Sequence, residues 1–198
     1  MELSELFEMG LPKPSQVTSL GEIPEAGYRA IMMDPPWTEV GGGRIRRGAD
    51  RHYPLVKTKD MPSVIQAGDL WRPAENCHLW MWVTNNYLKD GLWLMEELGF
   101  RYVTNAVWVK QRKGLGQYMR GQHELLLFGV KGRSMVPETD CRPPTVIHAD
   151  RTQHSRKPDE FYELVETVSN GPYLEVFARR GRPGWHSWGN QIVKEVTP

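Results

Sequence analysis

Short apolar segments separated by polar or glycine-rich stretches mark the chain from residue 28 onward. Continuous apolar runs bounded by turn residues are typical of strands that are buried on both faces. The pattern predicts strands over residues 28–33, 78–83, 102–109, 123–130 and 173–178, with a shorter one at 145–148.

Three other segments carry apolar residues at helical spacing. One predicted helix ends before Gly99, a second covers about 58–67, and a third begins at Pro158, a residue type that suits the first helical position. The apolar residues expected on their inward faces are Leu88, Leu92, Met95 and Leu98 in the first, Val64 and Ile65 in the second, and Phe161, Leu164, Val165 and Val168 in the third.

The alternation of strands and helices predicts a mainly parallel α/β sheet. Residues 78–109 form a strand–helix–strand pattern, so these two strands are expected to be parallel with a right-handed crossover. In open parallel sheets, ligands bind beyond the carboxyl ends of the strands. Functional residues are therefore expected where the strands end.

Composition indicates an ordinary soluble protein: 198 residues, of which 39% are hydrophobic and 25% charged. We expect a peripheral arm over residues 1–20 and a single domain over 21–198. The formal net charge is only +1, which excludes binding of nucleic acid through overall charge and leaves local patches as the alternative.

The sequence also bears on location. No apolar run is long enough to span a membrane, and the acidic N-terminus lacks the basic start of a signal peptide. The two cysteines form no disulfide framework. We expect a cytoplasmic protein.

The segment Asp34-Pro35-Pro36-Trp37 directly follows the first predicted strand. The Asp34 carboxylate and the carbonyl of Asp34 or Pro35 can accept hydrogen bonds from an exocyclic amine. Each proline holds the preceding residue in an extended conformation, which would pre-position these acceptors. Trp37 is expected to offer a face for base stacking. The alternative is an ordinary turn in which Asp34 caps and Trp37 packs.

Two basic loops, 38–56 and 110–121, flank the expected site. The first contains three consecutive glycines, but no Gly-Lys-Ser/Thr follows them, so a phosphate-binding P-loop is excluded. Solvated surface loops are the plain alternative to a binding role. The candidates for phosphate contacts are Arg44, Arg46, Arg47, Lys113 and Arg120.

Two further groups contain residue types that can bind a metal or transfer a proton. Cys141, His148 and His154 are too few and too unevenly spaced for a zinc site, so no metal is expected. His123 and Glu124 lie inside a predicted strand. We interpret them as a structural hydrogen-bonded pair rather than an acid–base couple.

Four stretches together resemble one family, the DPPW-type adenine-N6 methyltransferases, to which the catalytic subunit of the eukaryotic mRNA N6-adenosine methyltransferase belongs. Their order is that of the family, and the similarity is greatest to short bacterial and bacteriophage members. The stretches are Asp34-Pro35-Pro36-Trp37, 121–127 (GQHELLL), 154–159 (HSRKPD), and 174–179 (LEVFAR) with 188–191 (WGNQ).

The resemblance covers about residues 28–192. It implies a Rossmann-like class I fold that uses S-adenosylmethionine, with a permuted motif order. The substrate-amine motif lies near the N-terminus and the cofactor strand near the C-terminus. The implied reaction is methyl transfer to the N6 amine of adenine in nucleic acid, without a metal or a covalent intermediate.

The resemblance also implies roles for individual residues. Asp34, Pro35, Pro36 and Trp37 would be catalytic, and Asp34 would lie close to the methionine end of the cofactor. Tyr53 would lie near the target adenosine. The chain departs from the mRNA enzyme at Arg180-Gly181-Arg182, where that enzyme keeps a His-Asn pair for the ribose, and before residue 28, where a strand with an acid is missing. The other implied cofactor contacts are Lys157, Glu175, Arg179, Asn190 and Gln191.

The identity of the acceptor polymer stays open at this point, with DNA favoured over RNA. A catalytically silent subunit of a dimer is another alternative, but such subunits usually lose the Asp or the Trp of the motif, and here both are present. A nucleotide-binding protein without transfer activity would need no amine acceptors. The short chain has no obvious target-recognition domain, so any sequence readout is expected from the two basic loops.

Overall fold

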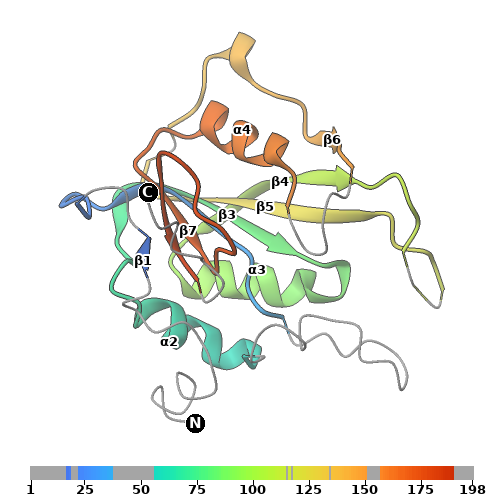
Figure 1. Ribbon diagram of the computed structural model, residues 1–198, viewed down its shortest axis with the longest axis horizontal. Helices are drawn as coiled ribbons and strands as arrows, with labels where there is room; N and C mark the ends of the chain where they lie inside the picture. The colour runs from blue at the N-terminus through green and yellow to red at the C-terminus, as the bar shows by residue number, and fades with distance from the viewer. Residues whose placement is uncertain are drawn as a thin grey trace, which may run out of the picture.

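The computed structural model describes residues 17–18, 22–37, 56–114, 116, 118–133, 135–150 and 157–189. Within them, eight strands form one sheet in the order β1-β8-β7-β2-β3-β5-β4-β6 (Figure 1). All six predicted strands are present: β2 (Tyr28–Met33), β3 (Pro73–Val83), β4 (Arg101–Val109), β5 (His123–Lys131), β6 (Val146–His148) and β7 (Tyr173–Val176).

The three predicted helices are also present. They are α2 (Met61–Gln66), which follows a 3-10 turn at Thr58–Asp60, α3 (Leu88–Glu97) and α4 (Asp159–Val168). Two further 3-10 turns lie at Asn85–Tyr87 and Thr139–Cys141. Gly99 follows α3 with φ of 82°, the left-handed conformation that ends many helices.

Two strands were not predicted. β8 (Trp185–Trp188) pairs in parallel with β7, and β1 (Val17–Thr18) pairs antiparallel with β8. β8 contains a histidine and a serine and follows a segment rich in glycine and arginine, so its pattern does not indicate a strand. The segment forms a strand because it pairs with β7, not because of a pattern in its own sequence.

Four of the neighbouring strand pairs are parallel (β2·β3, β2·β7, β4·β6 and β7·β8) and three are antiparallel (β1·β8, β3·β5 and β4·β5). This confirms the prediction of a mainly parallel α/β sheet. β3 and β4 are parallel as expected, since both run antiparallel to β5, but β5 lies between them. The carboxyl ends of β2, β3, β4 and β7 and the start of β5 therefore share one edge of the sheet.

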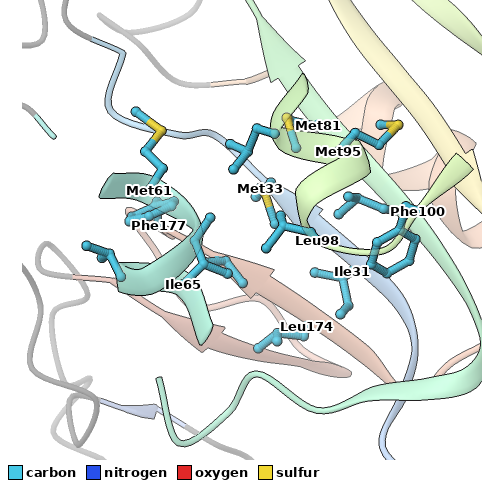
Figure 2. Packing of buried hydrophobic residues seen from close by; sticks show 14 of the residues in the cluster. Ile31, Met33, Met61, Ile65, Met81, Met95, Leu98, Phe100, Leu174 and Phe177 are labelled. Atoms are coloured by element: carbon cyan, nitrogen blue, oxygen red, sulfur yellow. The ribbon is translucent and has the colours of Figure 1, made fainter. Parts of the chain in front are cut away.

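Helices cover both faces of the sheet, with α2 and α3 on one side and α4 on the other (Figure 1). Alternate residues of each buried strand serve the two sides. The larger cluster joins Ile31, Met33, Met81 and Leu174 of the strands to the first side, where Met61, Ile65 and Met95 of the helices meet them (Figure 2). The second cluster, under α4, is rich in aromatic rings: Trp80, Trp82, Trp108, Phe161, Tyr162 and Trp185.

Helix α3 packs very closely on the sheet at Gly91. A Cβ added at this glycine would overlap Cγ1 of Val83 and lie 3.2 Å from Cδ1 of Leu127. The absence of a side chain therefore allows α3 to sit directly on β3 and β5.

Candidate active site

Asp34 leaves the carboxyl end of β2 beside the end of β7. Met33 pairs with Val176 across the two strands, and the backbone N–H of Asp34 donates to the Val176 carbonyl at 3.4 Å. Strand alternation directs the Asp34 side chain to the α4 face, the face that Glu175 and Glu124 also occupy. The amine motif and the strand assigned to the cofactor thus end side by side.

Lys157, two residues before α4, links two of these carboxylates. Its Nζ lies 3.2 Å from Oδ2 of Asp34 and 3.1 Å from Oε2 of Glu124. The other oxygen of Glu124 is paired with Lys110, the residue that follows β4. The result is a line of alternating charges, Asp34–Lys157–Glu124–Lys110, along the carboxyl edge of the sheet.

The charge line shifts the pKa values of Glu124 and Lys157 so that both are ionised at neutral pH. Although burial alone would raise the pKa of the Glu124 carboxyl, Lys157 and Lys110 lower it to about 2. Burial likewise opposes the charge on Lys157, but Asp34 and Glu124 outweigh it and raise the pKa of its ammonium group. At neutral pH, Lys157 is therefore a fixed cation that occupies Oδ2 of Asp34. Among the described residues, Oδ1 of Asp34 has no side-chain partner.

Each of the two lysines of the charge line lies over the face of an indole ring. Nζ of Lys157 lies 4.7 Å from the centre of the Trp82 ring, and Nζ of Lys110 lies 4.7 Å from that of Trp108. The quadrupole of an indole face attracts a cation. The two rings also meet edge to face, with centroids 6.2 Å apart.

The stacking role predicted for Trp37 is wrong for this structure. Its ring is 4% exposed, is stacked on Tyr87 at 5.4 Å, and donates its Nε1–H to the Trp82 carbonyl at 3.1 Å. Trp37 therefore anchors the end of the motif in the core. The Pro35 carbonyl accepts the Trp37 backbone N–H at 2.8 Å, and its second lone pair remains for an incoming donor.

The predicted pairing of His123 with Glu124 is also wrong. Adjacent residues of a strand point to opposite faces, and here His123 is exposed while Glu124 enters the charge line. The place of Glu124 in the site could be inferred from the sequence only if the position of β5 in the sheet were also known. As an antiparallel strand between β3 and β4, β5 begins at the edge where its neighbours end.

Glu175 is the penultimate residue of β7, and its carboxyl group is buried with only one oxygen hydrogen-bonded. Oε1 accepts the Tyr162 hydroxyl at 2.9 Å, whereas Oε2 is buried with no hydrogen-bond partner among the described residues. Burial raises the pKa of Glu175 to about 7; the bond from Tyr162 opposes this shift and the charge of Asp34 reinforces it.

Unpaired polar atoms gather at this edge. Besides Oε2 of Glu175, Nε1 of Trp82 and Oγ1 of Thr84, at the end of β3, are buried without partners among the described residues. Buried polar atoms are normally hydrogen-bonded, so such a cluster suits a polar ligand. A free carboxylate oxygen can accept a sugar hydroxyl, which fits the ribose of the implied cofactor.

The turn after β7 is shaped by an unusual backbone. Phe177 has φ of 62°, a conformation uncommon for a bulky side chain, while its ring packs on Trp188 at 5.5 Å. Close beside it, a Cβ on Gly189 would overlap the Ala178 carbonyl. Strained backbone of this kind clusters at ligand sites. Arg179, which follows this turn, is half-buried.

The departure at Arg180-Gly181-Arg182 has a structural explanation. Arg180 and Arg182 both pair with Asp159 in the first turn of α4, and Arg182 also approaches Glu166 at 3.4 Å. Their guanidinium groups lie 5.5 and 4.5 Å from the centre of the Tyr162 ring. These contacts fasten the segment after β7 to the helix that carries Tyr162.

Several predicted site residues do not join this cluster. Lys113 and Arg120 are exposed on the β4–β5 loop and form no ion pair with any residue that the structure describes. The part of the chain that is described contains no group of three His, Cys, Asp or Glu that could hold a metal ion, and no helix that could cross a membrane. The residues that lie outside the described ranges are Tyr53, Arg44, Arg46, Arg47, His154, Asn190 and Gln191.

Comparison with known proteins places this geometry in a family. The MT-A70 family model matches residues 28–191, which spans the motif, the charge line and the strand β7. The chain belongs to the MT-A70 family. Members of the MT-A70 family are N6-adenine methyltransferases that use S-adenosylmethionine as the methyl donor.

Individual relatives cover different shares of their own length. The type II methyltransferase M.MunI of a Mycoplasma species is 29% identical over 94% of this chain and 89% of its own. The N(6)-adenosine-methyltransferase MT-A70-like protein of Arabidopsis thaliana is 32% identical over 83% of this chain but 24% of its own. The human N(6)-adenine-specific methyltransferase METTL4 is 28% identical over 84% of this chain and 38% of its own. The chain therefore spans nearly all of the first relative and well under half of the others.

Proposed function

We propose that this MT-A70 protein methylates the N6 amine of adenine in DNA, with Asp34 as the acceptor that orients the amine. The observation that carries the proposal is the Asp34 carboxylate at the end of β2, with Oδ2 occupied by Lys157 and Oδ1 without a side-chain partner among the described residues. Glu175, with its unpaired Oε2, lies on the neighbouring strand.

The physical task at this site is to activate a weak nucleophile. The lone pair of an exocyclic adenine amine is conjugated with the ring. Acceptors that bond both amine hydrogens favour a pyramidal nitrogen and stabilise the positive charge that develops on it. Oδ1 of Asp34 and the Pro35 carbonyl, each with a lone pair available, are the two acceptors this structure offers.

The other members of the charge line set the position of Asp34. Lys157 fixes the rotation of the carboxylate by binding Oδ2, so that Oδ1 keeps one orientation. Glu124 balances the charge of Lys157 and is itself held by Lys110. Pre-organisation of this kind lowers a barrier because the groups need not reorganise during the reaction.

Glu175, Lys157 and Arg179 are the described residues proposed to hold the cofactor. S-adenosylmethionine, when bound, supplies an electrophilic methyl group on a sulfonium. Oε2 of Glu175 is proposed to accept a ribose hydroxyl, since it is buried and unpaired while Oε1 is satisfied by Tyr162. The carboxylates of Glu175 and Asp34 thus belong to adjoining parts of one site.

DNA is proposed over RNA because the relative that matches along nearly its whole length is named as a type II methyltransferase. The Arabidopsis relative, named for N(6)-adenosine, matches over only 24% of its own length. Methylation of RNA adenosine is the second candidate.

The proposal is tested by transfer of tritium from labelled S-adenosylmethionine to single-stranded DNA, duplex DNA and RNA. Asp34→Asn is expected to lower the rate about a hundredfold, the usual effect of removing one such electrostatic group. Asp69→Asn, at an exposed aspartate, is the matched control and should retain the wild-type rate. Transfer by Asp34→Asn at the wild-type rate, with equal folding of both variants, would contradict the proposal.

A further inference from the structure

The loop between β4 and β5 is a narrow projection with a firmly bonded neck. The backbone N–H of Lys110 donates to the Gln122 carbonyl at 2.8 Å, and that of Gly114 donates to the Gly121 carbonyl at 2.6 Å. The Gln122 side chain closes the neck further, with Nε2 3.0 Å from the Lys110 carbonyl. The loop extends beyond the carboxyl edge of the sheet (Figure 1).

The tip of this projection carries two apolar side chains in full contact with solvent. Tyr118 is 98% exposed and Met119 85%, more than any other large apolar residue that the structure describes. Isolated apolar residues at a surface need no explanation, but two at the end of an extended loop are unusual.

Charge surrounds the apolar tip. Arg112, Lys113 and Arg120 are all exposed, and the sequence from 110 to 122 contains no Asp or Glu. An apolar tip on a cationic stem matches the surface of a nucleic acid, in which stacked bases lie between two lines of phosphates.

The neck of the loop is part of the active site. Lys110 and Glu124 flank the neck and form one end of the charge line, which continues through Lys157 to Asp34. The loop therefore leaves the sheet at the same edge at which Asp34 follows β2.

We propose that Tyr118 and Met119 form a wedge that enters the base stack of duplex DNA at the place from which the target adenine has been turned out. The inference rests on the proposed function, because a base inside a duplex must leave the stack before its amine can reach Asp34. Apolar side chains inserted between base steps are a common means of holding such distortions. The exposed cations of the stem contact the flanking phosphates.

A wedge has a specific consequence: it assists duplex substrates and is dispensable for single strands, whose bases need no unpairing. The test compares wild type with the double variant Tyr118→Ala/Met119→Ala, which removes only exposed groups. Duplex and single-stranded oligonucleotides of one sequence are methylated in parallel. The control variant is Val136→Ala, at another exposed apolar residue that lies outside the loop.

The double variant is expected to lose about tenfold in kcat/KM on duplex DNA while its rate on the single strand stays within about twofold. A duplex with a mismatch at the target adenine should recover most of the loss, because its base is easier to extrude. A duplex with 2-aminopurine at the target position reports extrusion without catalysis. Its fluorescence should rise on binding wild type and Val136→Ala, and not on binding the double variant.

Equal losses on duplex and single strand, or no loss on either, would overturn the wedge while leaving the proposed function intact. An unchanged 2-aminopurine signal on binding of wild type would overturn the wedge as well. Failure of the proposed function is distinguished by the absence of adenine methylation in both duplex and single-stranded DNA; activity on RNA alone would overturn both the wedge and the proposed function.

Discussion

At the scale of residues, the site depends on how four charges share one edge of the sheet. Asp34, Lys157 and Glu175 were predicted from the sequence, because each lies in a motif to which the resemblance assigns a role. Glu124 lies in the similar stretch 121–127 but was given no role in the site, and neither was Lys110, since the role of both depends on which strand lies beside which. Trp37 was predicted in the wrong role, because a sequence does not show which faces of a ring are covered.

The free energy of unfolding at acid pH tests the contribution of the charge line to stability. The pKa of Glu124 is lowered to about 2 in the folded chain from an ordinary value near 4.5. Its ion pairs therefore stabilise the fold above about pH 4.5, and this contribution is lost as the pH falls toward 2. Glu124→Gln should lower the free energy of unfolding by about 2 kcal/mol at pH 7, with the difference from wild type narrowing below pH 4.5.

Urea denaturation at several pH values measures this difference. Glu97→Gln, at an exposed glutamate of α3, is the control and should follow the wild type throughout. If the free energy of unfolding of Glu124→Gln stayed below that of wild type by the same amount from pH 7 down to pH 3, the charge of Glu124 would not be what stabilises the fold.

Glu175 should make cofactor binding depend on pH near neutrality. Its pKa of about 7 reflects burial, so that the carboxyl is largely protonated at pH 6 and largely ionised at pH 8. A ribose hydroxyl donates more strongly to the ionised form. Affinity for S-adenosylhomocysteine, measured by calorimetry, should therefore rise from pH 6 to pH 8 in the wild type and stay flat in Glu175→Gln. A parallel rise in both proteins would assign the dependence to another group.

At the scale of elements, strands and helices with strong periodicity were predicted close to their observed bounds. β2 matches its predicted range, and α3 ends where Gly99 indicated. β8 was missed because its order comes from pairing with β7 rather than from its own pattern. The insertion of β5 between β3 and β4 was missed for a related reason, since strand order is a property of the sheet and not of any segment.

The packing of α3 yields a prediction at this scale. Alanine favours a helix over glycine by about 1 kcal/mol, so Gly91→Ala would stabilise an exposed helix. Here a Cβ would overlap Cγ1 of Val83, a stiff β-branched side chain on β3. Gly91→Ala should therefore lower the free energy of unfolding, by about 1–3 kcal/mol. Glu96→Ala, exposed on the same helix, should change it little. A more stable Gly91→Ala protein in thermal denaturation would refute the close packing.

At the scale of the whole molecule, the mainly parallel sheet brings distant parts of the sequence to one edge. The ends of β2, β3, β4 and β7 and the start of β5 all lie there, so residues from 34 to 179 can form one site. The fold class and the family could be predicted from the order of the motifs. The charge line and the exposed loop tip could not, because both require the strands to be placed in space.

The most direct test of the central claim identifies the atom that receives the methyl group. Duplex DNA incubated with wild type and S-adenosylmethionine would be digested to nucleosides and examined by mass spectrometry against authentic standards. The account predicts N6-methyldeoxyadenosine from the wild type and from Asp69→Asn, and about a hundredfold less from Asp34→Asn. Methylation at another base or at a ring nitrogen, or equal yields from Asp34→Asn and wild type, would contradict it.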